Sequence, residues 1–399
     1  MIAQQPLRGV RVLDLSRVLA GPFCTMNLAD LGAEVIKIEI PGRGDDSRGY
    51  APRIPNSSDS GYYYSVNRGK QSVTLDLRQP EGAEVLLALA RHADVVVENF
   101  SPGTMGRFNL GYERLCAANP RIILCSISGF GQTGPMAAAP AYDIVAQALG
   151  GTMSITGQPD GEPMRCGVSI GDLAAALYGV VAILAALRAC EQTGHGQHLD
   201  IAMLDCQVAW LEDALARYSA TGRVPGPIGS RHPSITPFQQ FRAADGHFVA
   251  GCGNEAIWQR FCDAIGMDAL KADARFATNA DRTANHPELE AILARHFATA
   301  PRADWLRRLE AANVPCAPIA NVAEVAANPH LKEREMILRA DHRAFDGLIV
   351  PGSPLKTAGA GGAPDTRAPD LGEHTDAVLS RLLGYNSARI ADLRARKVI

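Results

Sequence analysis

Short apolar runs rich in β-branched residues alternate with helix-like segments through the first part of the chain. The runs VRVLDL (10–15) and EVIKIE (34–39) predict strands, and FCTMNLADLG between them has helical spacing and ends at Gly32. Two more strands are predicted within ADVVVENF and RIILCSIS, each preceded by a helix-like segment. Alternation of this kind is typical of a parallel sheet covered by helices on both faces, so we expect an α/β fold.

A long run of Ala and Leu predicts a helix in the middle of the chain. It extends from 172 to about 190, and a second helix follows from about 203 to 219. The apolar stretch 174–187 is shorter than the roughly 20 residues that a membrane-spanning helix needs, and it contains Tyr178 and Gly179. We interpret it as a buried core helix and expect no membrane contact.

The pattern changes after about residue 220. Residues 221–240 concentrate Gly and Pro, which is typical of an extended linker between two compact units. A chain of 399 residues also exceeds the size at which a single hydrophobic core stops growing. We expect a large domain that begins with residues 1–220, a smaller α/β domain over 241–325, and a less regular segment, 326–399, that ends in a helix.

Composition narrows the class of protein. Hydrophobic residues make up 47% of the chain and charged residues 20%, and the formal charge is -3, so no basic surface for a nucleic acid is predicted. Arg8 and Arg11 interrupt the apolar residues near the start, and no signal-peptide pattern is present. The nine cysteines are scattered without a C-x-x-C pair, which favours neither a disulfide framework nor a zinc site. We expect a cytoplasmic protein that binds no metal.

The segment from Gly129 to Gly134 reads G-x-G-x-x-G directly after a predicted strand. A dinucleotide fingerprint must open a helix whose first turn binds the pyrophosphate. Here Pro135 and the loop-like MAAAPA follow instead. We therefore expect no nicotinamide cofactor.

Three other segments carry groups that could bind a ligand but also fit ordinary turns. The turn 17–22 leads from the first strand into a helix, and Gly and Pro there expose helical N–H groups to an anion. The segments 67–70 and 99–103, followed by Arg107, lie beside predicted strands, at whose carboxyl ends ligands bind in open α/β sheets. Lys and Arg could hold phosphates and Phe100 could contact an adenine. Solvated charges beside turns are the alternative.

Asp172 stands in GVSIGDL, directly before the apolar helix. From the residues alone, an N-cap that satisfies unpaired backbone donors explains this aspartate. Gly167 and Gly171 nevertheless leave the carboxylate reachable and allow backbone N–H groups to face an oxyanion, as a nucleophilic carboxylate requires. Both interpretations stay open at this point.

Ordered motifs along nearly the whole chain resemble those of the family III CoA-transferases, which include formyl-CoA transferase and carnitine CoA-transferase. The motifs are VLDLSRVLAGPFCTMNLADLGAEVIKIE, GDDSRG, NRGKQSVTLDL, ADVVVENFSPGTM, SISGFGQTGP, AYDIVAQALGG, GDLAAALYG, TGHGQHLDIAMLD and DLGEHT. The resemblance implies a Rossmann-like large domain built from both ends of the chain, with 326–399 returning to it, and a homodimer of two interlocked rings. It implies that Asp172 is the catalytic aspartate. It also implies that a set of residues lies along the site of coenzyme A: Val18, Ala20, Lys70, Asn99, Phe100, Arg107 and Tyr142.

Departures from the family pattern bear on the substrate. Leu19 stands where the formyl-CoA and oxalate enzymes carry a glutamine, and their tetraglycine loop has no counterpart here, so the sequence disfavours oxalate. The related α-methylacyl-CoA racemases place a histidine before an aspartate in the segment that reads Ala141-Tyr142-Asp143 in this chain. Without that histidine, a two-base proton exchange lacks one partner.

We expect Asp172 to attack an acyl-CoA thioester and to pass through an aspartyl anhydride and an aspartyl-CoA thioester, with no ATP, metal or permanently bound cofactor. The expected partners are an acyl-CoA and a small carboxylic acid. The segment 229–234 resembles its counterpart in transferases that use succinyl-CoA with dicarboxylic acceptors, where Arg231 and His232 could hold a distal carboxylate. An ordinary linker is the alternative for these two residues. For the whole chain, the alternatives are a racemase or epimerase and a CoA-binding protein without turnover.

Overall fold

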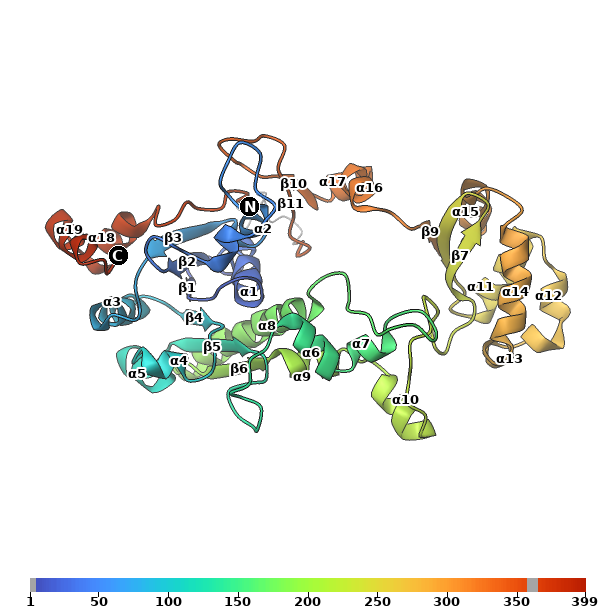
Figure 1. Cartoon of the computed structure of the whole chain (residues 1–399), viewed down its shortest axis with the longest axis horizontal. Helices are drawn as coiled ribbons and strands as arrows, with labels where there is room; N and C mark the ends of the chain where they lie inside the picture. The colour runs from blue at the N-terminus through green and yellow to red at the C-terminus, as the bar shows by residue number, and fades with distance from the viewer. Residues whose placement is uncertain (1–4, 357–364) are drawn as a thin grey trace. The chain divides into compact units, whose positions relative to one another are not determined.

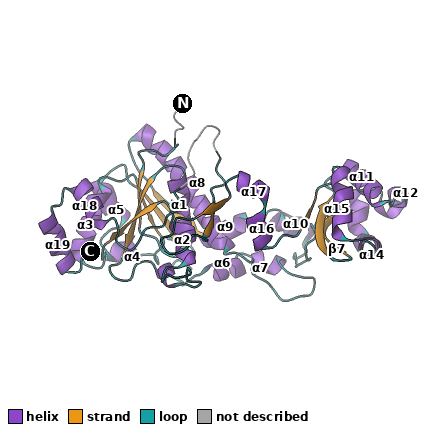
Figure 2. Ribbon diagram, turned by 90° about the horizontal axis from the view of Figure 1, so that it is seen from above, coloured by secondary structure: helices purple, strands orange, loops and turns teal. Residues whose placement is uncertain are grey.

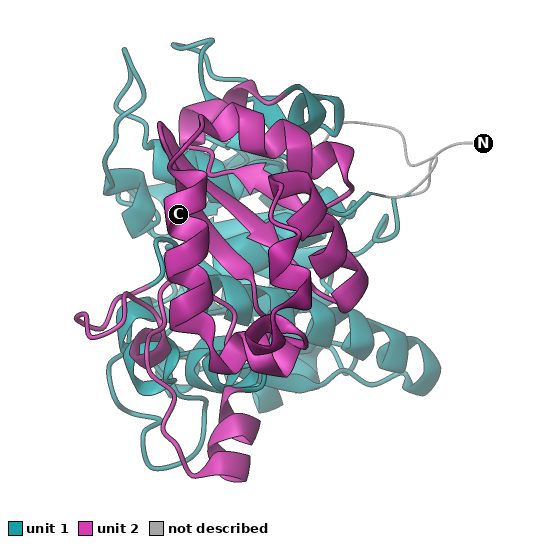
Figure 3. Cartoon of the chain, turned by 90° about the vertical axis from the view of Figure 1, so that its right-hand side faces the viewer, with its two compact units in different colours: residues 1–152, 166–213, 329–399 teal, residues 153–165, 214–328 magenta. Residues whose placement is uncertain are grey.

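The computed structural model describes residues 5–356 and 365–399, which form two compact units. Unit 1 consists of Met1–Thr152, Cys166–Asp213 and Pro329–Ile399, and unit 2 of Met153–Arg165 and Ala214–Asn328 (Figure 3). Unit 1 thus contains both ends of the chain. Residues 153–165 and 214–220, which we expected in the large domain, belong to unit 2, as do the expected linker residues 221–240.

A six-stranded sheet forms the centre of unit 1, with the strand order β3-β2-β1-β4-β5-β6 (Figure 1). All neighbouring strands pair in parallel, which confirms the predicted parallel α/β sheet. The chain connections lead away from β1 in one direction and from β4 in the other. The loops at the carboxyl ends of these two strands therefore diverge and leave room for a ligand. The strands are β1 (Arg11–Asp14), β2 (Glu34–Glu39), β3 (Lys70–Thr74), β4 (Val95–Glu98), β5 (Ile123–Ser128) and β6 (His198–Ala202).

Helices cover both faces of this sheet, as Figure 2 shows. Successive residues of a strand point to opposite faces: Val12 packs with α1 (Ala20–Asp30) and α8 (Ile170–Thr193), and Leu13 packs with α3 (Pro80–Ala90) and α18 (Thr375–Leu383). The remaining elements of unit 1 are η1 (Asp46–Gly49), α2 (Gly61–Asn67), α4 (Thr104–Arg107), α5 (Tyr112–Ala118), α6 (Asp143–Leu149), α9 (Met203–Ala209), α17 (Pro329–Glu333), β10 (Ile337–Arg339), β11 (Ile349–Pro351) and α19 (Ser387–Ala395), while α7 (Thr152–Ile155) begins at the boundary with unit 2.

The apolar helix α8 is buried on one face only. Gly179 lies on the buried face, where a Cβ would come within 3.2 Å of the Cys24 sulfur, so the missing side chain permits close packing against α1. Val181 on the other face is 63% exposed, and the expectation of a wholly buried helix is wrong for that face. By length and composition α8 could also cross a membrane, a test that core helices pass equally well.

Unit 2 is a smaller α/β body. Its antiparallel sheet, in the order β7-β8-β9, packs against helices through a core rich in aromatic side chains that includes Phe241, Phe248, Trp258 and Trp305. Its strands are β7 (Phe238–Ala243), β8 (Gly246–Gly251) and β9 (Cys316–Pro318). Its helices are α10 (Ala214–Thr221), α11 (Glu255–Ile265), α12 (Ala269–Ala272), η2 (Ala274–Phe276), α13 (Asn279–Ala284), α14 (His286–Phe297), α15 (Arg302–Ala311) and α16 (Val322–Ala327).

Candidate active site

A cavity of about 230 Å³ in unit 1 contains the carboxylate of Asp172. Its walls are the loops that follow β1, β4 and β5, together with the first residues of α6 and α8. These segments meet because the carboxyl ends of neighbouring parallel strands lie at one edge of the sheet. The cavity brings together six of the residues that the sequence had suggested: Val18, Ala20, Asn99, Phe100, Tyr142 and Asp172.

Asp172 does not cap its helix. α8 begins at Ile170 with Ser169 as its N-cap residue, and Asp172 lies in the first turn. The N–H of Gly171 instead donates to Asp143 Oδ1 at 2.7 Å, so an aspartate from α6 satisfies this donor of the α8 terminus. Among the residues that the structure describes, none donates a hydrogen bond to the Asp172 carboxylate. The N-cap interpretation is therefore wrong, and the carboxylate is available to a substrate.

The surroundings make Asp172 a stronger base than an ordinary aspartate. Burial, and then the negative charge of Asp143, raise the pKa of Asp172 from 3.8 to about 7. Asp143 is itself buried and accepts hydrogen bonds from Gly171 N–H and from Gln147 Nε2, both at 2.7 Å. Near neutral pH a large fraction of Asp172 is ionised, as a nucleophile must be, and it retains the basicity of a poorly solvated carboxylate.

Two tyrosines that the sequence analysis missed belong to this neighbourhood. Tyr50 lines the cavity, and Tyr62 from α2 packs edge to face against it with ring centroids 5.5 Å apart. Burial, and next the charge of Asp172, raise the pKa of the Tyr62 phenol to about 12. The run YYY at 62–64 was the available signal, but it is ambiguous because Tyr63 and Tyr64 are core residues.

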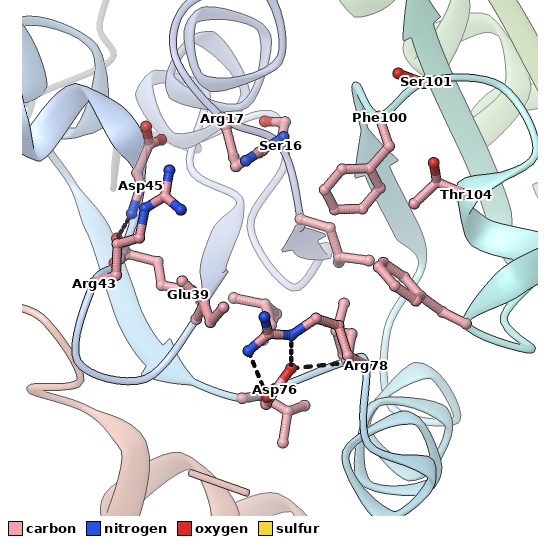
Figure 4. Close-up of a pocket in the computed structure, with 17 residues that line it drawn as sticks. Ser16, Arg17, Glu39, Arg43, Asp45, Asp76, Arg78, Phe100, Ser101 and Thr104 are labelled. Carbon is pink, nitrogen blue, oxygen red and sulfur yellow. Dashed lines mark hydrogen bonds and ion pairs between the residues drawn. The ribbon is translucent and has the colours of Figure 1, made fainter. Parts of the chain in front are cut away.

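A second cavity of about 300 Å³ lies at the carboxyl ends of β1 to β4 (Figure 4). It shares Arg17, Phe100 and Ser101 with the Asp172 cavity, so these three residues border both spaces. Arg43 and Arg78 also line it; they are ion-paired to Asp46 and Asp76. This cavity offers apolar rings and guanidinium groups, the features that bind an aromatic base and phosphates.

Two of the remaining predicted residues lie outside both cavities. Lys70 is buried, and its ammonium donates to Asp14 Oδ2, the Pro22 carbonyl and Asn67 Oδ1, each at 2.9 Å. Burial lowers the pKa of Lys70 to about 8, although Asp14 opposes the shift. Arg107 is exposed and donates at 2.6 Å to the hydroxyl of Thr104, a residue of the second cavity. Arg107 therefore lies where it could contact a ligand in the second cavity, whereas the Lys70 ammonium is paired inside the protein.

The two residues of the linker segment face different surroundings in unit 2. Arg231 lines a cavity of about 500 Å³, and its guanidinium donates no hydrogen bond to any residue within the described ranges. His232 does not line this cavity: its Nδ1 accepts from Ser234 N–H at 3.0 Å, and its ring packs against Phe238. The structure thus separates the two side chains that the sequence had grouped.

Neither a metal centre nor a dinucleotide turn is formed by the part of the chain that the structure describes. No three His, Cys, Asp or Glu side chains gather there as metal binding requires. The G-x-G-x-x-G segment opens no helix, because the next helix, α6, begins only at Asp143. All nine cysteines are free thiols.

Comparison with known proteins agrees with the motifs and the geometry. The model of "CoA-transferase family III" matches residues 7–375. An acetyl-CoA:oxalate CoA-transferase of Acetobacter aceti is 45% identical over 89% of this chain and 90% of its own length. A succinate–glutarate CoA-transferase of Agrobacterium fabrum is 41% identical over 94% of this chain and 96% of its own. The crystal structure of a CAIB/BAIF family protein from Brucella suis superposes with a TM-score of 0.83 at 40% identity, covering 94% of this chain and 99% of that one. The chain belongs to CoA-transferase family III.

Proposed function

We propose that this enzyme moves coenzyme A from succinyl-CoA to a small dicarboxylic acid and that the Asp172 side chain carries the coenzyme A between them as an aspartyl thioester. One observation supports the assignment of Asp172 above all. A partly buried carboxylate with a pKa near 7 and no hydrogen-bond partner among the described residues lines a cavity at the carboxyl edge of the sheet. Such a group is poorly solvated and therefore nucleophilic, whereas a structural aspartate would be paired.

The reaction begins with attack of the Asp172 carboxylate on the thioester carbonyl of succinyl-CoA. The carbon–sulfur bond breaks, the CoA thiolate leaves, and an aspartyl–succinyl anhydride forms. The thiolate then attacks the aspartyl carbonyl, which releases succinate and leaves an aspartyl-CoA thioester. The acceptor carboxylate attacks this thioester to form a second anhydride, and the thiolate attacks the acceptor carbonyl, freeing Asp172. Because one thioester replaces another, the exchange needs no net oxidation and no ATP.

The two adjoining cavities of unit 1 suit a molecule with a nucleotide end and a reactive end. The guanidinium groups of Arg17, Arg43 and Arg78 suit phosphates, and Phe100 offers an apolar face to an adenine. The shared border then leads toward Asp172, where Ala139, Ala141 and Met203 are among the lining residues. Apolar walls limit the access of water, which would otherwise hydrolyse the anhydride.

Two lines of support favour a dicarboxylate acceptor. The two related CoA-transferases, of Acetobacter aceti and Agrobacterium fabrum, are named for dicarboxylic acids, oxalate in one and glutarate in the other. The sequence argument against oxalate loses its force, because the oxalate enzyme is 45% identical to this chain. The guanidinium of Arg231 donates no hydrogen bond to any of the described residues, and guanidinium groups bind carboxylates well, so Arg231 remains our candidate for binding a distal carboxylate.

Replacement of Arg231 tests this role. Arg231→Ala should raise the KM for a dicarboxylic acceptor about 10- to 100-fold, the effect of losing a charge-assisted hydrogen bond. The KM for a monocarboxylic acid of similar length should change little. Arg223→Ala, an exposed arginine in the same segment, serves as the matched control. An unchanged KM for every dicarboxylate in the Arg231 variant would exclude Arg231 from the acceptor site. His232→Ala tests His232 in the same way.

The covalent route is tested by trapping. The protein is incubated with succinyl-CoA, treated with hydroxylamine and digested, and the modified peptide is identified by mass. We expect an aspartyl hydroxamate at Asp172 in the wild type and none in Asp172→Asn. An active transferase without modification at Asp172 would contradict the mechanism. A racemase would exchange the substrate α-proton in deuterated water without an acceptor, and a CoA-binding protein would bind acyl-CoA without labelling.

A homodimer is part of the same proposal. Four side chains on the outer face of α8 leave apolar surface exposed, and a face of this kind is typical of a protein interface: Leu177, Tyr178, Val181 and Leu184. A second copy of the chain is the partner that the family resemblance implies. The cytoplasmic location remains a prediction, which the free thiols fit.

A further inference from the structure

One residue of the Asp172 cavity has an unusual backbone conformation. Val18 has a φ of 69°, in the left-handed region. This region is uncommon for any residue except glycine and is most unfavourable for a β-branched side chain. Val18 lies between β1 and α1 in the cavity wall. Something in the structure must hold it there, because the residue itself prefers another conformation.

The carboxylate of Asp45 accepts the backbone N–H of this valine. The nitrogen of Val18 lies 3.1 Å from Oδ1 and 3.3 Å from Oδ2 of Asp45, a residue of the loop after β2. Asp45 is fixed in turn, since its Oδ1 accepts from the N–H of Ser47 at 2.9 Å and from its hydroxyl at 2.8 Å. The Asp45 carboxylate is therefore fixed by a residue of its own loop.

A fully buried ammonium completes this contact. Lys37 Nζ lies 2.9 Å from Asp45 Oδ2 and donates at 2.8 Å to the carbonyl oxygen of Ser16, two residues before Val18. Burial alone would lower the pKa of Lys37, but Asp45, Asp14 and Glu39 outweigh it and raise the pKa. Lys70 is the other cation at this site and pairs with Asp14. Lys37 thus stays charged. It contacts Ser16 directly and Val18 through Asp45, the two ends of the segment 16–18.

A third contact comes from another strand. The side chain of Asn99, directly after β4, accepts from Arg17 N–H and donates to the Arg17 carbonyl, both at 2.8 Å. This pairing uses the amide of Asn99 in the same way that a neighbouring strand would. The segment 16–18 is therefore held by groups that follow or belong to β2 and β4, and its position depends on the sheet.

We propose that Lys37 and Asp45 are positioning residues that hold Val18 in the left-handed conformation and thereby fix the wall of the Asp172 cavity. The inference rests on the proposed function of that cavity. Neither residue touches the reacting atoms. Their effect on catalysis passes through the backbone of the segment 16–18, which also carries Arg17, a residue that borders both cavities.

A double-mutant cycle tests the proposal. Lys37→Met with Asp45→Asn removes both charges together, because removing one alone would leave the other buried and unpaired and could unfold the chain. This paired change should lower kcat/KM for succinyl-CoA about tenfold or more, chiefly by raising the KM for succinyl-CoA, while the KM for the acceptor acid changes little. In the background of Val18→Gly the loss should shrink to about threefold or less, because glycine adopts the left-handed conformation without strain.

The control is an equally buried ion pair at the opposite end of α1. Asp30 and Arg68 pair with side chains 3% and 1% exposed, and neither contacts the segment 16–18 in the described structure. The effect of Asp30→Asn with Arg68→Met on kcat/KM for succinyl-CoA should be the same with Val18 and with Val18→Gly. Equal losses in both backgrounds for the Lys37 and Asp45 change would overturn the proposal.

Failure of the proposed function can be recognised separately. If wild-type Asp172 is never trapped as a hydroxamate, the covalent route fails. The coupling between Val18 and the Lys37–Asp45 pair is then measured from the midpoints of thermal unfolding of the same variants. The midpoint lost through the Lys37 and Asp45 change should be smaller in the Val18→Gly background than with Val18 present. Additive shifts in the midpoint would reject the positioning role whatever the enzyme catalyses.

Discussion

Two aspartates meet at the start of α8, Asp143 from α6 and Asp172 from α8 itself, and their surroundings differ. Asp143 is buried, accepts the Gly171 N–H and the Gln147 amide, and stabilises the helix terminus. Asp172, one residue beyond Gly171, accepts no hydrogen bond from the described residues and has its pKa raised to about 7. A carboxylate that already has two donors is a poor nucleophile, whereas a poorly solvated one is reactive. We therefore propose Asp172, and not Asp143, as the nucleophile.

The pH dependence of the reaction should reveal this pair. The nucleophile must be ionised, so kcat/KM for succinyl-CoA should fall as the pH drops through about 7, and at pH 6 roughly a tenth of Asp172 is ionised. Asp143→Asn keeps an oxygen for Gly171 N–H but removes the negative charge, which favours ionisation of Asp172. The acid limb should then move to lower pH but stay above 3.8, because burial is unchanged.

A pH series of initial rates, run with the exposed Asp205→Asn as control, measures the shift. If the acid limb of the pH profile of Asp143→Asn stays at the wild-type pH, or moves to higher pH, the electrostatic coupling between Asp143 and Asp172 is contradicted.

At the scale of elements, the C-terminal segment completes the sheet by covering the outer edge of β3. His374 N–H donates to the Ser72 carbonyl at 2.9 Å, and Thr74 N–H donates to Thr375 Oγ1 at 3.0 Å. Residues about 300 positions apart thus satisfy the backbone groups that an edge strand would leave unpaired. The motif DLGEHT acts in this structure as the cover of that edge rather than as part of a cavity.

Loss of one of these hydrogen bonds should destabilise the chain measurably. Thr375→Val keeps the shape of a side chain that is 1% exposed but leaves the Thr74 N–H without an acceptor, so the free energy of unfolding should fall by about 1–3 kcal/mol. Urea unfolding measures the difference. Thr221 in α10 is exposed, so water can replace the hydrogen bonds of its hydroxyl, and Thr221→Val should change the same free energy by less than about 1 kcal/mol. Equal effects of the two changes would argue against the role of Thr375 at the edge.

At the scale of the whole molecule, the exposed apolar face of α8 is a candidate interface for the proposed homodimer. The same helix carries Asp172 in its first turn and the apolar face in its middle turns. An interface on this face would therefore bury α8 on both sides, which would give the helix the fully buried environment that its composition predicts.

A charge on this face should dissociate the proposed dimer. Val181→Glu places a carboxylate on a side chain that is 63% exposed in the single chain, and burial of an unpaired charge at an interface is costly. Light scattering after size exclusion should report twice the mass of one chain for the wild type and one chain mass for the variant. Val322→Glu, at a position 84% exposed in α16, should leave the mass unchanged. A monomeric wild type would refute the dimer directly.

Periodic patterns in the sequence determined the local elements. The runs at 10–15 and 34–39 form strands of the central sheet, and the Ala/Leu run forms α8, because side-chain periodicity reports which face of an element is buried. The ordered motifs also pointed to Asp172 and to five other residues that line its cavity. These features depend on neighbours close in the sequence or on the family pattern.

The tertiary structure decided what each polar side chain does. Lys70 was grouped with the ligand site by its motif, but its ammonium donates three hydrogen bonds inside the protein. The side-chain amide of Asn99 is hydrogen-bonded to the backbone of Arg17. Tyr62 reaches the neighbourhood of Asp172, and Arg231 and His232 point to different surroundings. No periodicity encodes these outcomes, because hydrogen-bond partners and burial depend on residues brought together from distant parts of the chain.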